Sequence, residues 1–188
     1  MTIYLALLRG INVGTKNRIK MDALQLVFEE IGLDSVQTYI QSGNVLFTSD
    51  SEETALRERI EGAVFKKFGI TAPVILRTAA EIHDVIEQLP FTVREIAQAQ
   101  AANTEGESLY VYLMHELPDP AKIDALQQFA GGDRFCEQGR NIYLLLSQSI
   151  RNSKLALQIQ RLSTATTARN WNTILKLYKM MQTMLDED

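Results

Sequence analysis

Apolar residues in the first part of the chain follow two spacings. One is the run or alternation typical of strands, and the other is the i, i+3, i+4 repeat of amphipathic helices. The run Ile3–Arg9 predicts a buried strand, and helical spacing over Met21–Ile31, followed by Gly32, predicts the first helix. The same pattern continues to residue 77 and yields βαββαβ, the order of a ferredoxin-like unit. The six predicted elements are 3–9, 21–31, 36–41, 45–48, 52–68 and 72–77.

The second part of the chain repeats most of this order. A short helix opens at Thr78 and ends at Leu89, and residues 91–107 predict a linker or a loose helix. The chain is expected to close with two helices, so that a helix stands where the last strand of the unit would be. No clear residue-level repeat accompanies the similarity. The remaining predicted elements are a strand at 109–115, a helix between Pro120 and Gly131, a hairpin of 134–138 and 142–147, and helices at 152–162 and 168–185.

We therefore expect an α+β fold of two ferredoxin-like (βαββαβ-type) halves, the second with a helical C-terminus. The predicted domains are residues 1–77, a helix and linker over 78–107, and residues 108–188. A chain of 188 residues with 46% hydrophobic residues is long enough for a core of normal size. The only cysteine, Cys136, has no partner in the chain, and no apolar run is long enough to cross a membrane. Both observations favour a cytoplasmic protein without a membrane partner.

Alternation along the predicted strands separates two sheet faces. The side that carries Ile3, Leu5 and Leu7, grouped with Val45 and Phe47, is predicted to pack under helices. The other side is rich in tyrosine and too apolar to be fully hydrated. Packing between sheets, cover by a partner subunit, and base stacking as in an RNA-recognition sheet are three alternatives for it. Its tyrosines are Tyr4, Tyr39, Tyr110, Tyr112 and Tyr143.

Charge changes this picture, because the net charge of −4 conceals two basic segments. Residues 1–20 hold four basic side chains and residues 148–185 hold six, and neither segment contains an acid. If the fold brings the two segments together, they form a composite basic cleft on an acidic body. Two separate solvated faces are the alternative.

The first basic segment contains a loop with features of an anion site. Gly10 and Gly14 allow a close approach of backbone to ligand, and Asn12 adds hydrogen-bonding groups. Lys16 and Arg18 supply positive charge. The spacing matches neither a phosphate-binding P-loop nor a dinucleotide fingerprint. The alternative is an exposed connection whose glycines serve turn geometry.

Two further segments contribute candidate residues. Gly43 predicts a turn with positive φ. Two roles are open for the neighbouring Ser42 and Asn44: they contact a ligand, or they form hydrogen bonds with the amides of the turn. In the second basic segment, Thr166 or Thr167 is expected to cap a helix whose N-terminus, with Arg169 and Asn170, would attract an anion. The alternative is simple capping above a buried stripe of Trp171, Ile174, Leu175 and Tyr178. The predicted ligand-binding residues are Arg9, Asn12, Lys16, Arg18, Ser42, Asn44, Lys154, Arg169, Asn170 and Lys176.

Three motifs together resemble the bacterial family called domain of unknown function 1697. They are Arg9-Gly10-Ile11-Asn12-Val13-Gly14, Tyr39-Ile40-Gln41-Ser42-Gly43-Asn44 and Arg169-Asn170-Trp171-Asn172-Thr173. The resemblance covers nearly the whole chain and implies ferredoxin-like halves, and it implies no activity.

The function expected from the residues is binding of an anionic ligand: a nucleotide, a nucleic acid or a phosphorylated metabolite. One alternative is a small-molecule enzyme that uses the same residues, although no Ser/His/Asp, Cys/His or metal-ligand spacing is present. Another is a homodimeric assembly protein without chemistry. No cofactor and no metal are expected.

Overall fold

The computed structural model describes residues 1–187, and the chain divides into two compact units. Unit 1 contains residues 1–83 together with the last helix from Leu177 onward, and unit 2 contains residues 84–176. No helix of the described residues combines the length and the apolar character needed to cross a membrane.

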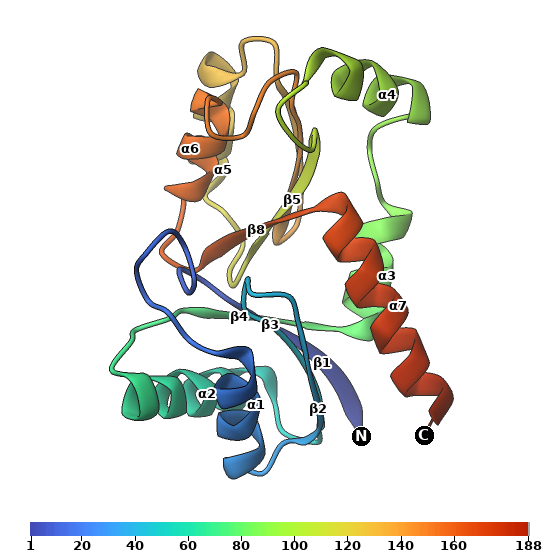
Figure 1. Ribbon diagram of the computed structural model, residues 1–188. Coiled ribbons are helices and arrows are strands. Elements are labelled where there is room, and N and C mark those ends of the chain that lie inside the picture. The colour runs from blue at the N-terminus through green and yellow to red at the C-terminus, as the bar shows by residue number, and fades with distance from the viewer. Residues whose placement is uncertain (188) are drawn as a thin grey trace. The chain divides into compact units, whose positions relative to one another are not determined.

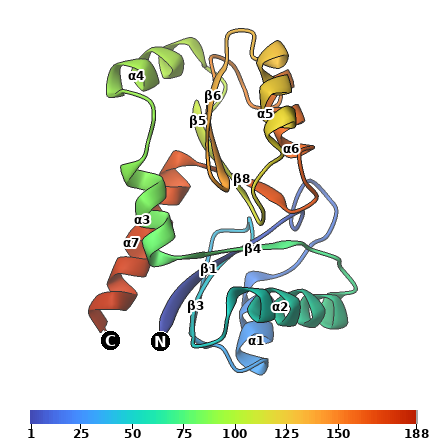
Figure 2. The same ribbon diagram turned by 180° about the vertical axis from the view of Figure 1, so that it is seen from behind.

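Unit 1 is built around a four-stranded antiparallel sheet in the order β2-β3-β1-β4. Helices α1 and α2 lie side by side on one face of this sheet (Figures 1 and 2). The αL glycine Gly69 ends α2, as its sequence position predicts. The elements of this part are β1 (Thr2–Leu8), α1 (Met21–Glu30), β2 (Asp34–Tyr39), β3 (Asn44–Ser49), α2 (Glu53–Phe68), β4 (Val74–Thr78) and α3 (Ala79–Glu87).

Unit 2 contains a second four-stranded antiparallel sheet in the order β6-β7-β5-β8. Helices α5 and α6 cover one face of it (Figure 2). The elements are α4 (Val93–Ala102), β5 (Leu109–Met114), α5 (Pro120–Leu126), the 3-10 turn η1 (Gln127–Phe129), β6 (Arg134–Gln138), β7 (Asn141–Leu145), α6 (Lys154–Gln160), β8 (Thr166–Asn170) and α7 (Trp171–Glu187). The α+β class with two ferredoxin-like sheets is thereby confirmed, and α7 follows the second sheet.

The two sheets correspond in register as well as in strand order. Leu5 of β1 pairs with Arg77 of β4, and Val111 of β5 pairs with Arg169 of β8. Each arginine is buried and donates from Nη1 to the carbonyl of the residue before it, at 2.8 Å in both units. A helix follows directly after each of these strands. The two units therefore share one topology, which is evident from the strand pairing although the sequence shows no clear residue-level repeat.

The prediction of helix from residue 168 is wrong, since residues 166–170 form strand β8. Thr166 and Thr167 are β-branched and pair with Met114 and Leu113, so the strand completes the free edge of β5. The predicted threonine cap is wrong for the same reason. Instead, Asn170 caps α7 by accepting a hydrogen bond from the Thr173 backbone N–H at 2.8 Å.

The predicted sheet faces are wrong for strands β1 and β5, whereas Val45 and Phe47 of β3 lie under the helices as predicted. Tyr4, not Leu5, lies in the helix-covered core of unit 1 together with Phe47, and Tyr112 occupies the corresponding core of unit 2. Their hydroxyls donate to the backbone oxygens of Ser51 and Ala156, both at 3.2 Å. Both faces of strands β1, β3, β5 and β7 are buried, so alternation cannot identify the face under the helices.

Residues 91–107 contain a formed helix, α4, in agreement with one of the two alternatives. Thr92 and Glu95 make a reciprocal capping box at its N-terminus, and Glu95 also pairs with Arg134 at 2.6 Å. None of the α4 residues is buried. The helix is therefore defined by its cap and its polar contacts more than by a core.

Candidate functional site

The loop between β1 and α1, residues 9–20, is longer than its counterpart. It uses twelve residues, whereas the corresponding connection from β5 to α5 uses only five, 115–119. The fold can therefore make this connection without the added length. Ile11 and Ile19 anchor the loop in the core of unit 1, while residues 13–18 are exposed.

Two asparagines with positive φ hold the loop in one conformation. The side chain of Asn12 (φ 54°) donates to the Ile19 carbonyl at 2.9 Å and accepts from the Ile19 N–H at 2.8 Å. The side chain of Asn17 (φ 51°) donates to the Gly10 carbonyl at 2.9 Å, and the backbone carbonyl of Asn17 accepts from the Asn12 backbone N–H. Asn12 is therefore a residue that shapes the loop.

The loop is fixed to the hairpin turn between β2 and β3, residues 39–44. Asn12 Nδ2 donates to the Gln41 carbonyl at 2.9 Å. Ile11 packs on Gly43, where an added Cβ would lie 2.7 Å from Ile11 Cδ1, and Gly43 also has φ 74°. We call loop 9–20 and turn 39–44 together the loop–hairpin tip.

Within the turn, Asn44 and Ser42 organise the backbone. Asn44 is fully buried, and its Nδ2 donates to the Tyr39 carbonyl at 3.0 Å and to Ser42 Oγ at 2.9 Å. Of the two roles predicted for these residues, these contacts of Asn44 fit that of a turn-forming residue.

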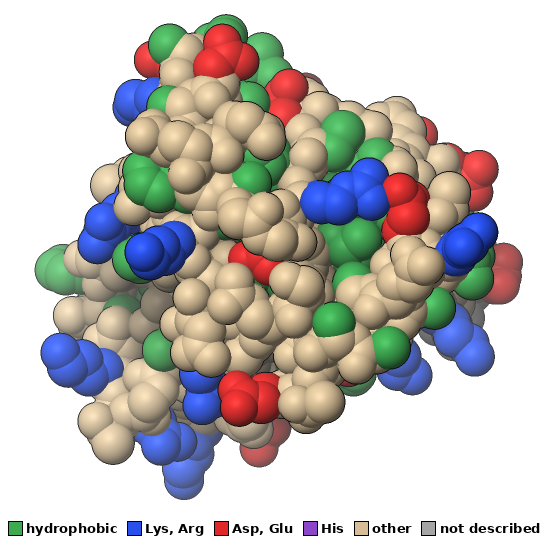
Figure 3. Space-filling view, turned by 90° about the horizontal axis from the view of Figure 1, so that it is seen from above, with side chains coloured by type: hydrophobic (Ala, Val, Ile, Leu, Met, Phe, Trp, Pro, Cys, Tyr) green, Lys and Arg blue, Asp and Glu red, His purple; other side chains and the backbone are tan. Residues whose placement is uncertain are grey.

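The cations of the tip are exposed. Among residues 1–187, Lys16, Arg18 and Lys20 form no ion pair, and all three are exposed to solvent. Arg9 is half-buried at the end of β1. Lys and Arg side chains stand out from the surface, as the face in Figure 3 shows. The tip thus combines a fixed backbone with three accessible positive charges.

The predicted residues of the second basic segment have different surroundings. Arg169 lies in β8, donates to Thr167 Oγ1 and the Ala168 carbonyl at 2.8 Å, and is buried, which lowers its pKa to about 10. Its proposed place at a helix N-terminus is therefore wrong. Asn170 uses its side-chain oxygen as the cap of α7. Lys154, the first residue of α6, and Lys176 of α7 are exposed.

The structure brings together the predicted residues of unit 1. Asn12 and Gly43 connect the loop of Lys16 and Arg18 to the turn of Ser42 and Asn44. Arg169 and Asn170 are neighbours in unit 2. A composite cleft formed by both segments stays a prediction.

Sequence reasoning missed two exposed apolar residues of the tip, Val13 and Ile40. Their exposed fractions are 67% and 50%. Ile40 has φ 46°, a conformation that a β-branched residue rarely adopts. An apolar residue within a segment rich in Gly and Asn is the only sequence signal for either.

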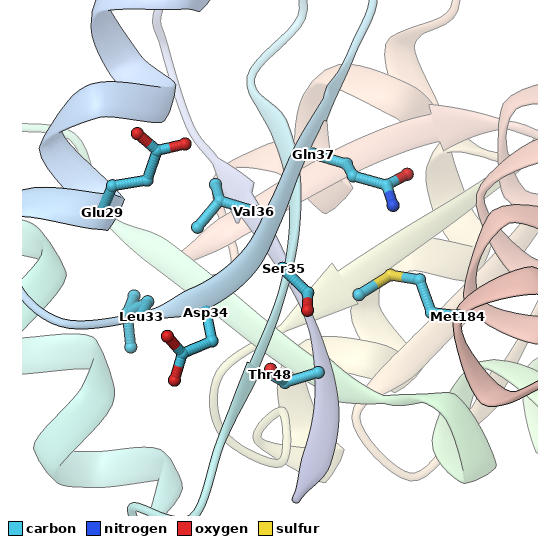
Figure 4. A pocket seen from close by; sticks show the side chains of 8 residues that line it. All are labelled: Glu29, Leu33, Asp34, Ser35, Val36, Gln37, Thr48 and Met184. Atoms are coloured by element: carbon cyan, nitrogen blue, oxygen red, sulfur yellow. The ribbon is translucent and has the colours of Figure 1, made fainter. Parts of the chain in front are cut away.

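A separate cavity of about 700 Å³ lies in unit 1 around the edge strand β2. Val36 and Leu33 lie on the α1 side of the strand, and Gln37 and Met184 lie on the other (Figure 4). None of the predicted ligand-binding residues lines it. Among the described residues, no group of three His, Cys, Asp or Glu side chains is placed to hold a metal ion.

Comparisons with known proteins identify the family and give no activity. No curated protein matches the chain. The conserved bacterial protein SP0830 from Streptococcus pneumoniae has a similar structure, with a TM-score of 0.72 and 25% sequence identity over 96% of this chain and 98% of that chain. The model of the family described as "Protein of unknown function (DUF1697)" matches residues 1–143, more than half of the chain. This match contains the first two of the three motifs and ends before the third. It confirms the resemblance to the family, and the chain belongs to the DUF1697 family.

Proposed function

We propose that the chain binds a phosphate-bearing ligand (a nucleotide, a nucleic acid or a phosphorylated small molecule) at the loop–hairpin tip of unit 1. One observation carries the proposal: Lys16, Arg18 and Lys20 project from a loop that hydrogen bonds hold in place, and they form no ion pair among residues 1–187. Exposed cations on a fixed backbone bind a polyanion without the cost of ordering the loop.

The length of the loop supports the same proposal. Unit 2 joins the corresponding strand and helix in five residues, and these include Glu116 and Asp119. The connection in unit 1 is seven residues longer, and it carries Lys16, Arg18 and Lys20 and no acidic residue. Residues beyond structural need on a rigid scaffold are where binding groups are commonly found.

The proposal is tested by isothermal calorimetry with inorganic triphosphate, ATP and a short RNA, each at several salt concentrations. The double variant Lys16→Ala/Arg18→Ala should weaken binding about tenfold or more and reduce the salt dependence by about two charges. The matched control is Arg59→Ala/Lys66→Ala, which removes two exposed cations from α2 of the same unit. No binding at low salt, or equal losses in both double variants, would overturn the proposal.

The two alternatives from the sequence, an enzyme at the same residues and a homodimeric assembly protein, stay predictions. Turnover in a metabolite screen that disappears in Lys16→Ala would favour the enzyme. Light scattering at micromolar concentration tests the homodimer, because it measures the mass of the protein in solution; the mass of a monomer would reject it.

A further inference from the structure

The loop–hairpin tip carries apolar as well as basic side chains. Val13 and Ile40 are exposed by 67% and 50%, and each is the chain neighbour of a residue that joins the two segments. Asn12 donates to the Gln41 carbonyl at 2.9 Å, so Val13 follows one partner of this bond and Ile40 precedes the other. Two aliphatic side chains therefore belong to the same small region as Lys16 and Arg18.

The conformation of Ile40 adds to this observation. A φ of 46° is unfavourable for a β-branched side chain, and Asn or Gly would adopt it with less strain. Since the side chain is half exposed, only its buried half packs within the unit. A strained exposed residue at a fixed turn is a candidate for contact with a ligand.

We propose that the phosphate-bearing ligand of the tip is a nucleoside phosphate whose base lies against Val13 and Ile40. This inference rests on the proposed function. Lys16 and Arg18 meet the phosphate groups, and the aliphatic pair covers one face of the base. An inorganic phosphate or a sugar phosphate would leave the apolar pair unused.

Polar neighbours of the pair favour a base over a lipid chain. Thr15 and Gln41 are exposed and lie within two residues of Val13 and Ile40, respectively, along the chain. Insertion into acyl chains would remove these polar groups from water without new partners, which is unfavourable. The edges of a base carry donors and acceptors that can replace the lost water.

The test compares two ligands of equal charge that differ only in the base. Adenosine 5′-monophosphate and ribose 5-phosphate are titrated against the full chain, with UMP as a pyrimidine probe, and binding is followed by NMR shifts of the Gly14 and Gln41 amides, which the variant below retains. We expect the nucleotides to bind about fivefold more tightly than ribose 5-phosphate. In Val13→Asn/Ile40→Asn this preference should fall to about one, with the affinity for ribose 5-phosphate unchanged.

The matched control is Leu26→Gln, which changes an exposed aliphatic residue of α1 in the same unit and should keep the preference. Equal affinity of the original chain for the nucleotides and ribose 5-phosphate would overturn the inference and leave the proposed function standing. If none of these probes bound and inorganic triphosphate did not bind either, both the inference and the proposed function would be overturned. Sedimentation with phosphatidylserine vesicles that is lost in the double Asn variant, without a preference for the nucleotides, would assign the tip to a lipid surface and also overturn the inference.

Discussion

At the scale of single residues, Gly43 belongs to one of the three motifs and is required by the local structure of the hairpin turn. Its φ of 74° and its contact with Ile11 are two separate reasons for a glycine. The first could be expected from the turn sequence, since glycine is the usual residue at positive φ. The second depends on where Ile11 lies and has no signal in the hairpin sequence itself.

Gly43→Ala should therefore lower the free energy of unfolding by about 2–3 kcal/mol, which combines left-handed strain of about 1–2 kcal/mol with a steric clash. Gly139→Ala is the matched control, because Gly139 has φ 60° in the hairpin of unit 2 and nothing lies within 4 Å of its added Cβ. Urea unfolding of both variants measures the difference, which isolates the contact with Ile11. Equal losses would show that the loop does not depend on this contact.

A substitution at Ile40 should raise the stability of the fold, in contrast to Gly43→Ala. Ile40→Asn keeps the turn and relieves left-handed strain, so the free energy of unfolding should rise by up to about 1 kcal/mol. Ile40→Val retains the β-branch and should give no gain. A clear loss of stability in Ile40→Asn would mean that the half-buried part of the side chain contributes more than the strain costs.

At the scale of elements, the predicted βαββαβ order of residues 1–77 matches the structure because each element carries its own periodicity. Strand β8 is different. Residues 166–170 contain a cap-like Thr pair before an amphipathic run, a pattern that also predicts a helix start. Residues 166–170 form a strand because they pair with the free edge of β5. Pairing between segments that are distant in the chain leaves no signal in the local sequence.

Helix α4 provides a pH-dependent prediction. The Thr92 backbone N–H, the Arg134 guanidinium and the Thr92 hydroxyl bind the Glu95 carboxylate and lower its pKa from 4.5 to about 2. Because the folded-state pKa is the lower one, the charged carboxylate stabilises the fold above about pH 4.5, and this contribution is lost as the pH falls through 2.

Carboxyl NMR titration should place the midpoint of Glu95 near 2. In Arg134→Ala the midpoint should rise only part of the way to 4.5, because the Thr92 backbone N–H remains. A midpoint near 4.5 in the unaltered chain would show that the capping box is not formed in solution.

At the scale of the whole molecule, the sequence predicts the two-part plan and leaves the detailed site unresolved. Charge counting marks residues 1–20 as basic, and the exposed cations Lys16, Arg18 and Lys20 lie in the loop that follows β1. It treats Arg169 in the same way, although that arginine is buried in a strand. Charge along a sequence does not report burial, and Val13 and Ile40 carry no charge at all.

Helix α7 is divided between the two units, and its second part belongs to unit 1. Leu177, Met181 and Met184 are buried, and Met184 lines the cavity beside β2 with Thr48. A chain that ends after Lys176 should therefore lose about 5 kcal/mol from the stability of unit 1, since three large apolar side chains are removed from its packing. Hydrogen exchange of the β2 and β3 amides measures this loss, and the β6 and β7 amides of unit 2 serve as the internal reference. Leu185→Gln, which changes an exposed position of the same helix, should leave both sets unchanged. If the β2 and β3 amides of the shortened chain kept full protection, α7 would be an appendage of unit 1 and not part of its core.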